Sequence, residues 1–387
     1  MVDDKLDDYD VLVISRYNMG KGGLENVVKD QVITLLNLGL KTAIAFRKVS
    51  KHEKIYIEVD AITVYDRLSS LPAIFISDII YAPVLYYFAS KLSTKILLDN
   101  FDFTILYAMF LFSKKRPVIV KVHHGTPNYL DSYSGIRGVF SRIYKLFLKL
   151  TLILSSKVID LHIAVSDKVK QELVKDYHIP PERIIVIYNG IDVERFKPRD
   201  KLLAREKLGL SLDKSIVLFV GHDMERKGYS LALKVVEFLR RFIPDLMFIV
   251  VTSPKHAKKI RKLEWLKVMS ELSLDLLALL YNASDVLLFP SRYDSFGLVA
   301  VEAIASGCPA IVSTNVGALD YKHSGEGYLV ANSLSEYLEY CKKVLTDDKF
   351  KSELVKKGRF FVTSRYDDRV TRDLYGKVIL SLLKLRR

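Results

Sequence analysis

The sequence predicts an α/β protein built from two Rossmann-like domains. Short runs of β-branched and apolar residues alternate with longer amphipathic stretches along the 387-residue chain. Half of the residues are hydrophobic, so a chain of this length can bury two sizeable cores. The alternation stops in a charged stretch that contains Pro198 and then starts again, which divides the strands and helices into two series.

The first series occupies residues 1–195 and predicts an N-terminal domain. It opens with a strand at Val11–Ser15, a glycine turn and a helix at Leu24–Leu38. Further strands are predicted at Thr42–Phe46, Thr104–Ala108, Val118–Val122, Leu161–Val165 and Ile184–Ile187. Strands that alternate with helices in this way form one doubly wound sheet.

The second series occupies residues 196–387 and predicts a C-terminal domain, whose last helix is expected either there or packed back on the first domain. Its strands are predicted at Ile216–Val220, Met247–Val251, Val286–Phe289 and Ala310–Val312. In open α/β sheets, ligands bind beyond the carboxyl ends of the strands, so two facing sheets would enclose a cleft. The residues directly after each strand are therefore the candidates for chemistry.

Composition limits the partners and the location. The formal net charge of +14 favours an anionic partner, but does not choose among lipid head groups, nucleic acid and phosphorylated small molecules. No helix-turn-helix, zinc or RNA-binding signature is visible, so nucleic acid is not the expected partner. Two cysteines without ligand spacing, an acidic N-terminus and the lack of a long apolar run predict a cytoplasmic protein.

An acidic pair, Asp8-x-Asp10, has the spacing of a metal-diphosphate site. It precedes the first strand and so lies at the opposite end of the sheet from the expected cleft. A solvated acidic terminus is the preferred interpretation. The sequence therefore predicts no metal site.

Two motifs of the first domain lie at the expected cleft. Gly22 and Gly23, in the turn that opens the first helix, would offer bare backbone amides to a phosphate, although plain turn geometry explains them as well. The dinucleotide fingerprint G-x-G-x-x-G is broken by Glu25, which disfavours NAD. His124 follows the strand Val118–Val122, where it would either bind a hydroxyl or phosphate, or cap local backbone.

In the second domain, Arg226 and Lys227 follow the strand Ile216–Val220. Two adjacent cations there suit a departing diphosphate, which otherwise needs a metal, although surface cations are common.

The sharpest motif is the block Pro290–Ala303, which follows the strand Val286–Phe289. A helix is predicted at Phe296–Ala305, whose first amides would be free to hold phosphate oxygens. The donor-binding candidates there are Ser295, Phe296, Gly297 and Leu298. Glu302 would reach a ribose diol and Asp294 the transferred sugar. The alternatives are that Asp294 caps the helix and that Glu302 pairs locally.

In this order the motifs resemble glycosyltransferase family 4, the retaining enzymes with the GT-B fold, from Val11 to about Val330. The matching residues are Gly22-Gly23-Leu24-Glu25, His124-Gly125, Ala164-Val165-Ser166, Asn189-Gly190-Ile191-Asp192 with Phe196 and Pro198, Val220-Gly221 with Lys227-Gly228, and Pro290-Ser291 through Glu302-Ala303 with Gly307 and Pro309. Each fragment is common, but their joint order and spacing are specific.

The resemblance implies a metal-independent, retaining hexosyltransferase that takes a nucleoside-diphosphate sugar as co-substrate and needs no other cofactor. It implies that Lys227 binds the diphosphate, Glu302 the ribose and Asp294 the sugar, with His124 beside the reacting centre. The sequence departs from the family at two positions: Asp294 replaces a glutamate, and His222 stands where an arginine is usual. Arg226 is the candidate to supply that missing charge.

The composition of the segment from Arg137 to Val158 indicates where the acceptor is found. The segment has no acidic residue and interleaves basic with aromatic and aliphatic residues; Arg142, Lys145 and Lys149 would share one side of a helix. Such a helix would lie on the inner face of a membrane and bring the enzyme to a lipid-linked or membrane-associated acceptor. Three alternatives stay open: an internal helix that covers the sheet, a catalytically weak protein that binds membranes or nucleic acid, and a sugar epimerase of the same fold.

Overall fold

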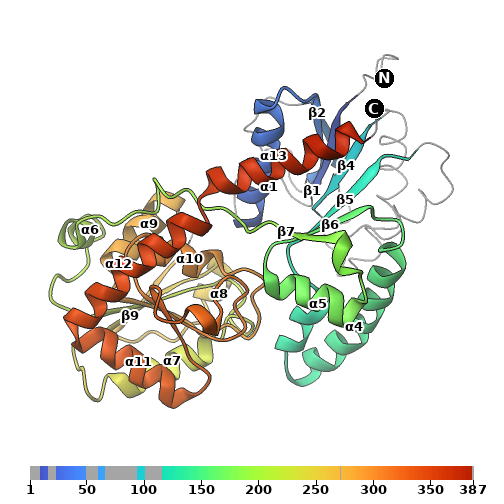
Figure 1. Ribbon diagram of the computed structural model, residues 1–387. Helices are drawn as coiled ribbons and strands as arrows, with labels where there is room; N and C mark the ends of the chain where they lie inside the picture. Colours follow the sequence, from blue (N-terminus) through green and yellow to red (C-terminus); the bar gives the residue numbers. More distant parts are fainter. Residues whose placement is uncertain are drawn as a thin grey trace. The chain divides into compact units, whose positions relative to one another are not determined.

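The computed structural model describes the chain as two compact units (Figure 1). Unit 1 comprises residues 1–127, 143–188 and 369–387, and unit 2 comprises residues 128–142 and 189–368. The residues whose structure is described are 9–15, 23–48, 60–65, 94–100, 116–270 and 272–385. The predicted strand at Thr104–Ala108 and the glycine turn with Gly22 lie outside these ranges.

Unit 1 contains a seven-stranded sheet in the order β3-β2-β1-β4-β5-β6-β7, with every described pairing parallel. In its register Val13 of β1 lies between Ile44 and Leu98. The strands are β1 Val11–Ser15, β2 Thr42–Lys48, β3 Asp60–Tyr65, β4 Ile96–Asp99, β5 Val118–His123, β6 Leu161–Ala164 and β7 Ile184–Val186. The helices are α1 Gly23–Asn37, α4 Gly135–Ser155, which begins in unit 2, α5 Asp167–Tyr177 and α13 Asp368–Lys384, with 3-10 turns at Pro127–Ser132 and Pro181–Arg183.

Unit 2 contains a six-stranded sheet in the order β10-β9-β8-β11-β12-β13, again with parallel pairings. The strands are β8 Ile216–Val220, β9 Met247–Val251, β10 Leu266–Met269, β11 Val286–Phe289, β12 Ala310–Val312 and β13 Tyr328–Val330. The helices are α6 Lys201–Lys207, α7 Tyr229–Leu239, α8 Pro254–Ala257, α9 Leu274–Ala283, α10 Leu298–Ala305, α11 Leu334–Thr346 and α12 Asp348–Arg365, with a 3-10 turn at Tyr321–His323.

Both strand orders reverse beside the first strand of the unit, as in a Rossmann fold. In unit 2 this switch point lies between β8 and β11, whose Leu218 and Leu287 are paired. Ligands of such sheets bind at the carboxyl ends of the strands on either side of the switch point. The loops after β8 and β11 are therefore where a ligand is expected.

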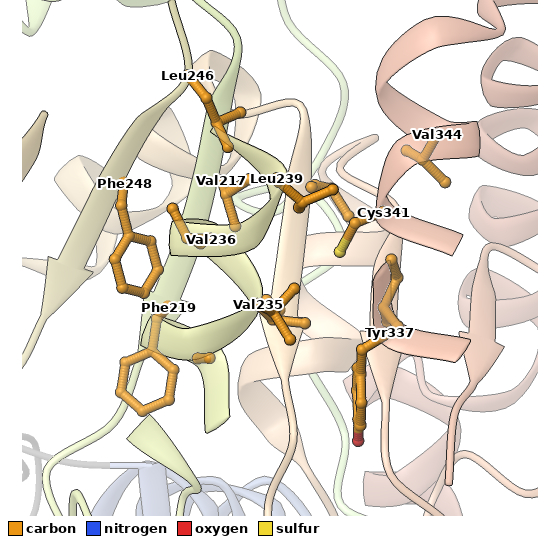
Figure 2. Close-up of a cluster of buried hydrophobic side chains, with 14 of the residues drawn as sticks. Val217, Phe219, Val235, Val236, Leu239, Leu246, Phe248, Tyr337, Cys341 and Val344 are labelled. Carbon is orange, nitrogen blue, oxygen red and sulfur yellow. The ribbon is translucent and has the colours of Figure 1, made fainter. Parts of the chain in front are cut away.

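The core of unit 2 gives these loops a rigid base (Figure 2). Phe219 of β8 and Phe248 of β9 are fully buried against α7, and Tyr337 and Cys341 of α11 belong to the same cluster. Burying a large apolar side chain stabilises the fold by about 1.5–3 kcal/mol. The β8 side of the switch point thus packs on a buried apolar cluster.

Helix α4 presents its large apolar residues outward. Its buried positions are Gly138, Ser141, Leu152 and Ser155, of which only Leu152 is a large apolar residue. The exposed large hydrophobic residues recur at helical spacing: Ile136, Val139, Phe140, Ile143, Leu146, Phe147, Leu150 and Leu154. These eight side chains therefore do not cover the sheet, whereas Leu152 on the same helix is buried.

Along the described ranges, none of the helices has the length and apolar character required to span a bilayer.

Candidate functional site

The loop after β8 is shaped by two glycines. Gly228 has a φ of 76°, and a Cβ at this position would lie 2.0 Å from the carbonyl oxygen of Pro290. Within the loop, the amide of Lys227 donates to the carbonyl of Asp223 at 2.8 Å. Gly221 leaves room for the aliphatic stem of Lys227, because a Cβ there would lie 2.8 Å from its Cγ. The loops after β8 and β11 consequently pack backbone against backbone.

Lys227 and Asp294 form an ion pair between these two loops. Their side chains are only 13% and 12% exposed, and the Lys227 ammonium lies 4.8 Å from the centre of the Phe289 ring. The backbone of Asp294 bonds to both Asn315 and Gly317, which fixes its position. Burial alone would raise the pKa of Asp294, but the Lys227 ammonium outweighs burial and lowers it. The two residues that were predicted to act on the donor are thus brought together, each as a charged group.

Helix α10 begins later than the sequence predicts. Its first residue is Leu298, and Gly297 is the N-cap with a φ of 97°, where a Cβ would lie 2.3 Å from Val316 Cγ1. The predicted start at Phe296 is wrong, because the left-handed conformation of Gly297 interrupts the helix. Asp294 is therefore not the N-cap residue, although its Oδ1 accepts from the Phe296 amide at 3.2 Å.

The other predicted donor-binding residues of the block Pro290–Ala303 differ in how far their side chains are exposed. The Phe296 side chain is 2% exposed and packs edge-on against the Tyr366 ring, so only its backbone can face a ligand. Ser295 and Leu298 are partly exposed. The first amides of a helix have no acceptor within the helix, which makes the start of α10 suited to phosphate oxygens.

Glu302 lies in the second turn of α10 and is 9% exposed. The Tyr281 hydroxyl donates to its Oε2 at 3.0 Å. Burial raises the pKa of Glu302 to about 7, although the Tyr281 hydroxyl and the more distant Arg195 act in the opposite direction. The local pair that sequence left as an alternative exists, and it leaves a carboxyl group that titrates near neutral pH.

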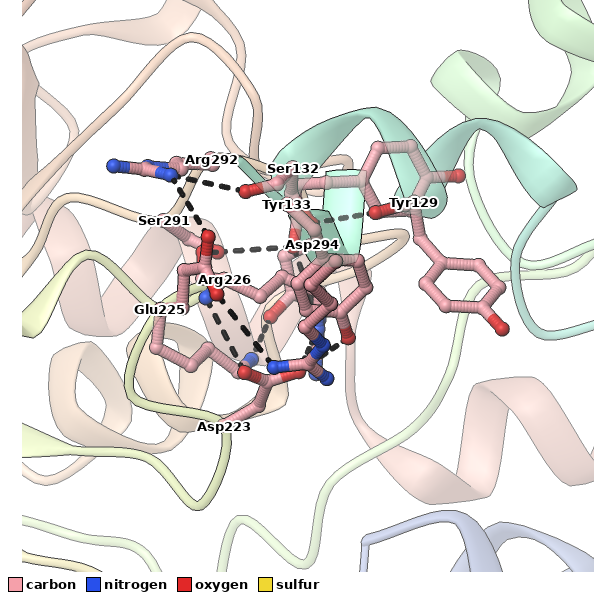
Figure 3. Close-up of polar contacts among 12 residues, drawn as sticks. Tyr129, Ser132, Tyr133, Asp223, Glu225, Arg226, Ser291, Arg292 and Asp294 are labelled. Carbon is pink, nitrogen blue, oxygen red and sulfur yellow. Dashed lines mark hydrogen bonds and ion pairs between the residues drawn. The ribbon is translucent and has the colours of Figure 1, made fainter. Parts of the chain in front are cut away.

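The Arg226 side chain is held at two points beside Asp294 of the Lys227–Asp294 ion pair (Figure 3). Its Nη1 donates to the carbonyl of Tyr293 at 3.0 Å, and its Nε lies 3.5 Å from Asp223 Oδ2. Its backbone carbonyl accepts from the Arg292 amide at 2.7 Å. The guanidinium is therefore fixed between the two loops while its side chain stays 24% exposed.

His222 occupies the position where the resemblance leads one to expect arginine. Burial lowers its pKa, and the neighbouring Lys227 and His256 lower it further. The imidazole is therefore neutral near pH 7 and supplies no fixed charge. In this loop the cationic groups at neutral pH are Arg226 and Lys227.

Sequence reasoning missed the partners of Arg226. Tyr133, 90 positions before Asp223, donates a hydrogen bond from its hydroxyl to Asp223 Oδ2 at 2.5 Å. Asp223 itself was passed over because a lone acid in a loop carries no motif. The proximity of Tyr133 to the loop arises from tertiary packing, for which the local sequence gives no signal.

The predicted residues of the first domain lie in unit 1. His124 follows β5, and its Nε2 lies 2.8 Å from Asn100 Oδ1. Gly23 is the first residue of α1, and Gly22 lies outside the described residues. Beneath His124, the buried rings of His123 and His162 stack with centres 5.1 Å apart. Asp10, the second acid of the Asp8-x-Asp10 pair, accepts from Lys95 at 2.7 Å before β1, at the opposite end of the sheet from His124.

In the parts of the chain that the structure describes, no three His, Cys, Asp or Glu side chains gather into a group that could hold a metal ion.

Sequence profiles of two families match the chain, one in each half. The profile described as Glycosyltransferase Family 4 matches residues 21–195, and the profile described as Glycosyl transferases group 1 matches residues 200–360. D-inositol 3-phosphate glycosyltransferase 2 of Catenulispora acidiphila is 33% identical over 173 residues, which are 41% of this chain and 40% of the relative. The chain thus matches about two-fifths of the length of such curated relatives.

Solved structures resemble nearly the whole chain. Sucrose-phosphate synthase from Thermosynechococcus elongatus has a TM-score of 0.81 at 19% identity, over 97% of this chain and 99% of that chain. Anabaena HepE, solved with UDP and glucose, has a TM-score of 0.75 at 16% identity, over 96% and 100%. At these identities the likeness establishes the fold, which is GT-B, as the sequence predicted.

Proposed function

Because the chain belongs to glycosyltransferase family 4, we propose that it transfers a sugar from a nucleoside-diphosphate sugar to an acceptor with retention at the anomeric carbon. The observation that carries this proposal is the Lys227–Asp294 ion pair between the loops after β8 and β11, at the switch point of the sheet. The buried cation and the start of α10 suit the negative diphosphate of a nucleotide sugar, and the buried acid suits the hydroxyl groups of its sugar.

Binding of the donor replaces the contact between Lys227 and Asp294 with contacts from each residue to the donor. Without a ligand, Lys227 and Asp294 neutralise each other in a site that is largely shielded from water. When the donor binds, its diphosphate takes the ammonium of Lys227, and hydroxyl groups of the sugar donate to Asp294. Glu302 then accepts hydrogen bonds from the ribose diol. Lys227 and Asp294 thus each lose the other as a partner and gain a group of the donor instead.

In the transfer step, the bond between the anomeric carbon and the diphosphate oxygen breaks, and the acceptor oxygen attacks the same face. The acceptor proton passes to the departing phosphate oxygen. Lys227 and Arg226 stabilise the negative charge that develops on the diphosphate, so that neither a metal nor another cofactor is required. The family resemblance assigns a role in this step to His124 as well.

Thermal unfolding with nucleotides tests the donor assignment. UDP is the first probe, because HepE was solved with it, and GDP and ADP follow with their hexose conjugates. A ligand at 100 times its dissociation constant stabilises the fold by about 2.7 kcal/mol. With the sugar identified, proton NMR of the product gives the anomeric configuration. Inversion, or the absence of any stabilising nucleotide, would contradict the proposal, and release of an epimerised sugar without transfer would favour the epimerase alternative.

The acceptor is proposed to be lipid-linked or membrane-associated and reached from the inner face of the membrane. The outward apolar stripe of α4 supports this assignment, together with Arg142, Lys145 and Lys149 beside it. Apolar side chains at helical spacing enter the interface between head groups and acyl chains. Each basic residue near an anionic surface adds about 1 kcal/mol of attraction.

Co-sedimentation with vesicles tests this part. We expect wild-type protein to bind vesicles that contain anionic lipid, and a variant with Arg142, Lys145 and Lys149 changed to Glu to lose binding. Lys349, Lys356 and Lys357 lie exposed on α12, and the same changes there are the matched control. Equal binding of the α4 variant and the control variant would remove the membrane role. Vesicle binding by a protein that ignores every nucleotide would instead favour a non-catalytic membrane-binding module.

A further inference from the structure

The segment Tyr129–Arg137, which leads into α4, contacts the loop after β8 through two of that loop's acids. The Tyr133 hydroxyl donates to Asp223 Oδ2 at 2.5 Å. Separately, the amide and hydroxyl of Ser134 donate to Glu225 Oε1 at 2.8 and 2.9 Å. Figure 3 shows Tyr133, Asp223 and Glu225 beside Arg226 and Asp294. One acid anchors the segment, and the other acid connects it to Arg226.

The contacts of Glu225 hold the segment in place without Tyr133. Arg137 Nη1 lies 3.6 Å from Glu225 Oε2, and Arg292 Nη1 lies 3.6 Å from Glu225 Oε1. Arg292 Nη1 also donates to the carbonyl of Ser132 at 3.1 Å. Loss of the Tyr133 hydroxyl alone therefore leaves the segment anchored to the loop.

Asp223 connects Tyr133 to the cations of the proposed diphosphate site. Its Oδ1 accepts from the Arg226 amide at 3.3 Å, and its Oδ2 lies 3.5 Å from Arg226 Nε. Its field also reaches Lys227, whose pKa it raises, although burial is the larger influence and lowers that pKa. A carboxylate this close to Arg226 competes with a diphosphate for the guanidinium unless it is held in one position.

The Tyr133 hydroxyl is suited to hold that carboxylate. Burial and the neighbouring Asp223 raise the pKa of Tyr133 to about 12, so the phenol keeps its proton. Burial alone would raise the pKa of Asp223, but the Tyr133 hydroxyl and Arg226 outweigh it and lower that pKa. The Arg137 guanidinium lies 3.8 Å from the centre of the Tyr133 ring and holds the ring from one face. A neutral donor and an ionised acceptor form a charge-assisted hydrogen bond.

We propose that Tyr133 is a positioning residue for diphosphate binding: by holding Asp223, it orients Arg226 and keeps the carboxylate from competing for the guanidinium. The inference rests on the proposed function and deepens it, since it assigns part of the donor affinity to a residue that precedes the donor half of the sequence. It also gives Arg226 a defined orientation in a loop where His222 carries no charge at neutral pH.

The selectivity for a diphosphate over a monophosphate measures this role. The probes are UDP, GDP and ADP with UMP, GMP and AMP, and the pair with the tightest diphosphate is used for the variants. We expect Tyr133→Phe to weaken the diphosphate by about threefold to tenfold and the monophosphate by less than about twofold. A purely structural role would weaken both nucleotides equally. Tyr321→Phe, at a tyrosine that is 61% exposed in the same unit, is the matched control.

A double-mutant cycle with Asp223→Ala completes the test. If Tyr133 acts through Asp223, Tyr133→Phe has no further effect on diphosphate affinity once Asp223 is removed. An unchanged diphosphate affinity in Tyr133→Phe, equal losses for both nucleotides, or additive losses in the double variant would each overturn the inference while the proposed function stands. Failure of the wild type to bind any of the nucleotides would overturn both.

Discussion

The two sheets share one strand order around their switch points but carry polar residues in different places. In unit 1 four buried polar residues lie within the strands: Asp99 in β4, Lys121 and His123 in β5, and His162 in β6. In unit 2 the strands around the switch point are apolar, and the charges of Lys227 and Asp294 lie in the loops that follow them. Residues within strands face the interior, whereas loop residues can meet a ligand.

The buried polar residues of the unit 1 strands pair with each other inside the protein, whereas the loop charges of unit 2 are placed to meet a ligand. Lys121 Nζ lies 3.2 Å from Asp99 Oδ2, with side chains 3% and 0% exposed. Burial lowers the pKa of His162 to about 3, and burial together with His162 lowers the pKa of His123 well below its ordinary value, so this stacked pair is neutral. We therefore expect the polar residues within the strands of unit 1 to set stability and the loop charges of unit 2 to set catalysis.

Lys121→Met should produce the largest effect, on stability. Removing the ammonium from beside buried Asp99 is expected to lower the free energy of unfolding by about 3–5 kcal/mol. The control is Lys95→Met, since the Lys95 side chain is 53% exposed in its pair with Asp10 and should cost about 0–1 kcal/mol. Urea unfolding of both variants measures the difference. Comparable losses would mean that the unit 1 pair is no more than a surface ion pair.

Lys227→Ala should come next, and its effect should be on turnover. Loss of a preorganised cation at the leaving group is expected to raise the barrier by about 2–4 kcal/mol, which lowers kcat about 30-fold to 1,000-fold. Lys234→Ala, at an exposed position of α7, is the matched control. Steady-state kinetics of folded protein decides the matter: a normal kcat in Lys227→Ala would show that the ion pair with Asp294 is structural, like that of unit 1.

Glu302→Gln should have a smaller effect, on nucleotide affinity. Loss of the carboxylate is expected to weaken binding of the bare nucleoside diphosphate by about 1–3 kcal/mol, because a hydrogen bond to a charged acceptor is lost. Asp294→Asn should instead spare this affinity and reduce turnover. Calorimetry together with kinetics separates the two acids, and the reverse pattern would exchange their roles.

Glu302 also predicts a pH dependence. Its pKa in the folded protein is about 7, above the ordinary 4.5, so its contribution to stability is present below about pH 4.5 and is lost as pH rises through 7. Ribose hydroxyls favour the ionised form, so nucleotide affinity should rise about threefold to tenfold between about pH 6 and pH 8. Glu302→Gln removes this increase while leaving the titration of the phosphate itself. A wild-type affinity with the pH profile of the variant would exclude Glu302 from the ribose site.

Chelation should have the smallest effect of all. Because Arg226 and Lys227 carry the charge of the leaving group in our proposal, EDTA should change the transfer rate by less than about twofold. Loss of activity with EDTA and recovery with manganese would show that a metal shares this role.

The sequence predicted best where local pattern and tertiary structure agree. The strands β8, β9, β11 and β12 begin and end where predicted, because three to five consecutive buried positions demand uninterrupted apolar residues. The sequence predicted that Lys227 and Asp294 bind two parts of the same donor, because each residue follows a strand at the switch point. Their direct contact required the structure.

The rest was decided by packing or by single backbone conformations. Strand β10 lies in a lysine-rich stretch and β13 has three residues, so neither offers a strong pattern. The start of α10 depends on the left-handed φ of Gly297, and a glycine in the sequence does not show whether its φ is positive or negative. Tyr133 reaches Asp223 across 90 positions, a distance over which no local rule operates.

The outward stripe of α4 also governs how the protein behaves in a test tube. Its eight large apolar residues are surrounded by cations, which repel a second copy at low ionic strength. Added salt screens that repulsion within a Debye length of about 8 Å at 0.15 M, while sulfate strengthens apolar association. Purified protein should therefore be monodisperse in dilute buffer and self-associate in ammonium sulfate, and substituting serine for Phe140 and Phe147 should abolish that colloidal instability.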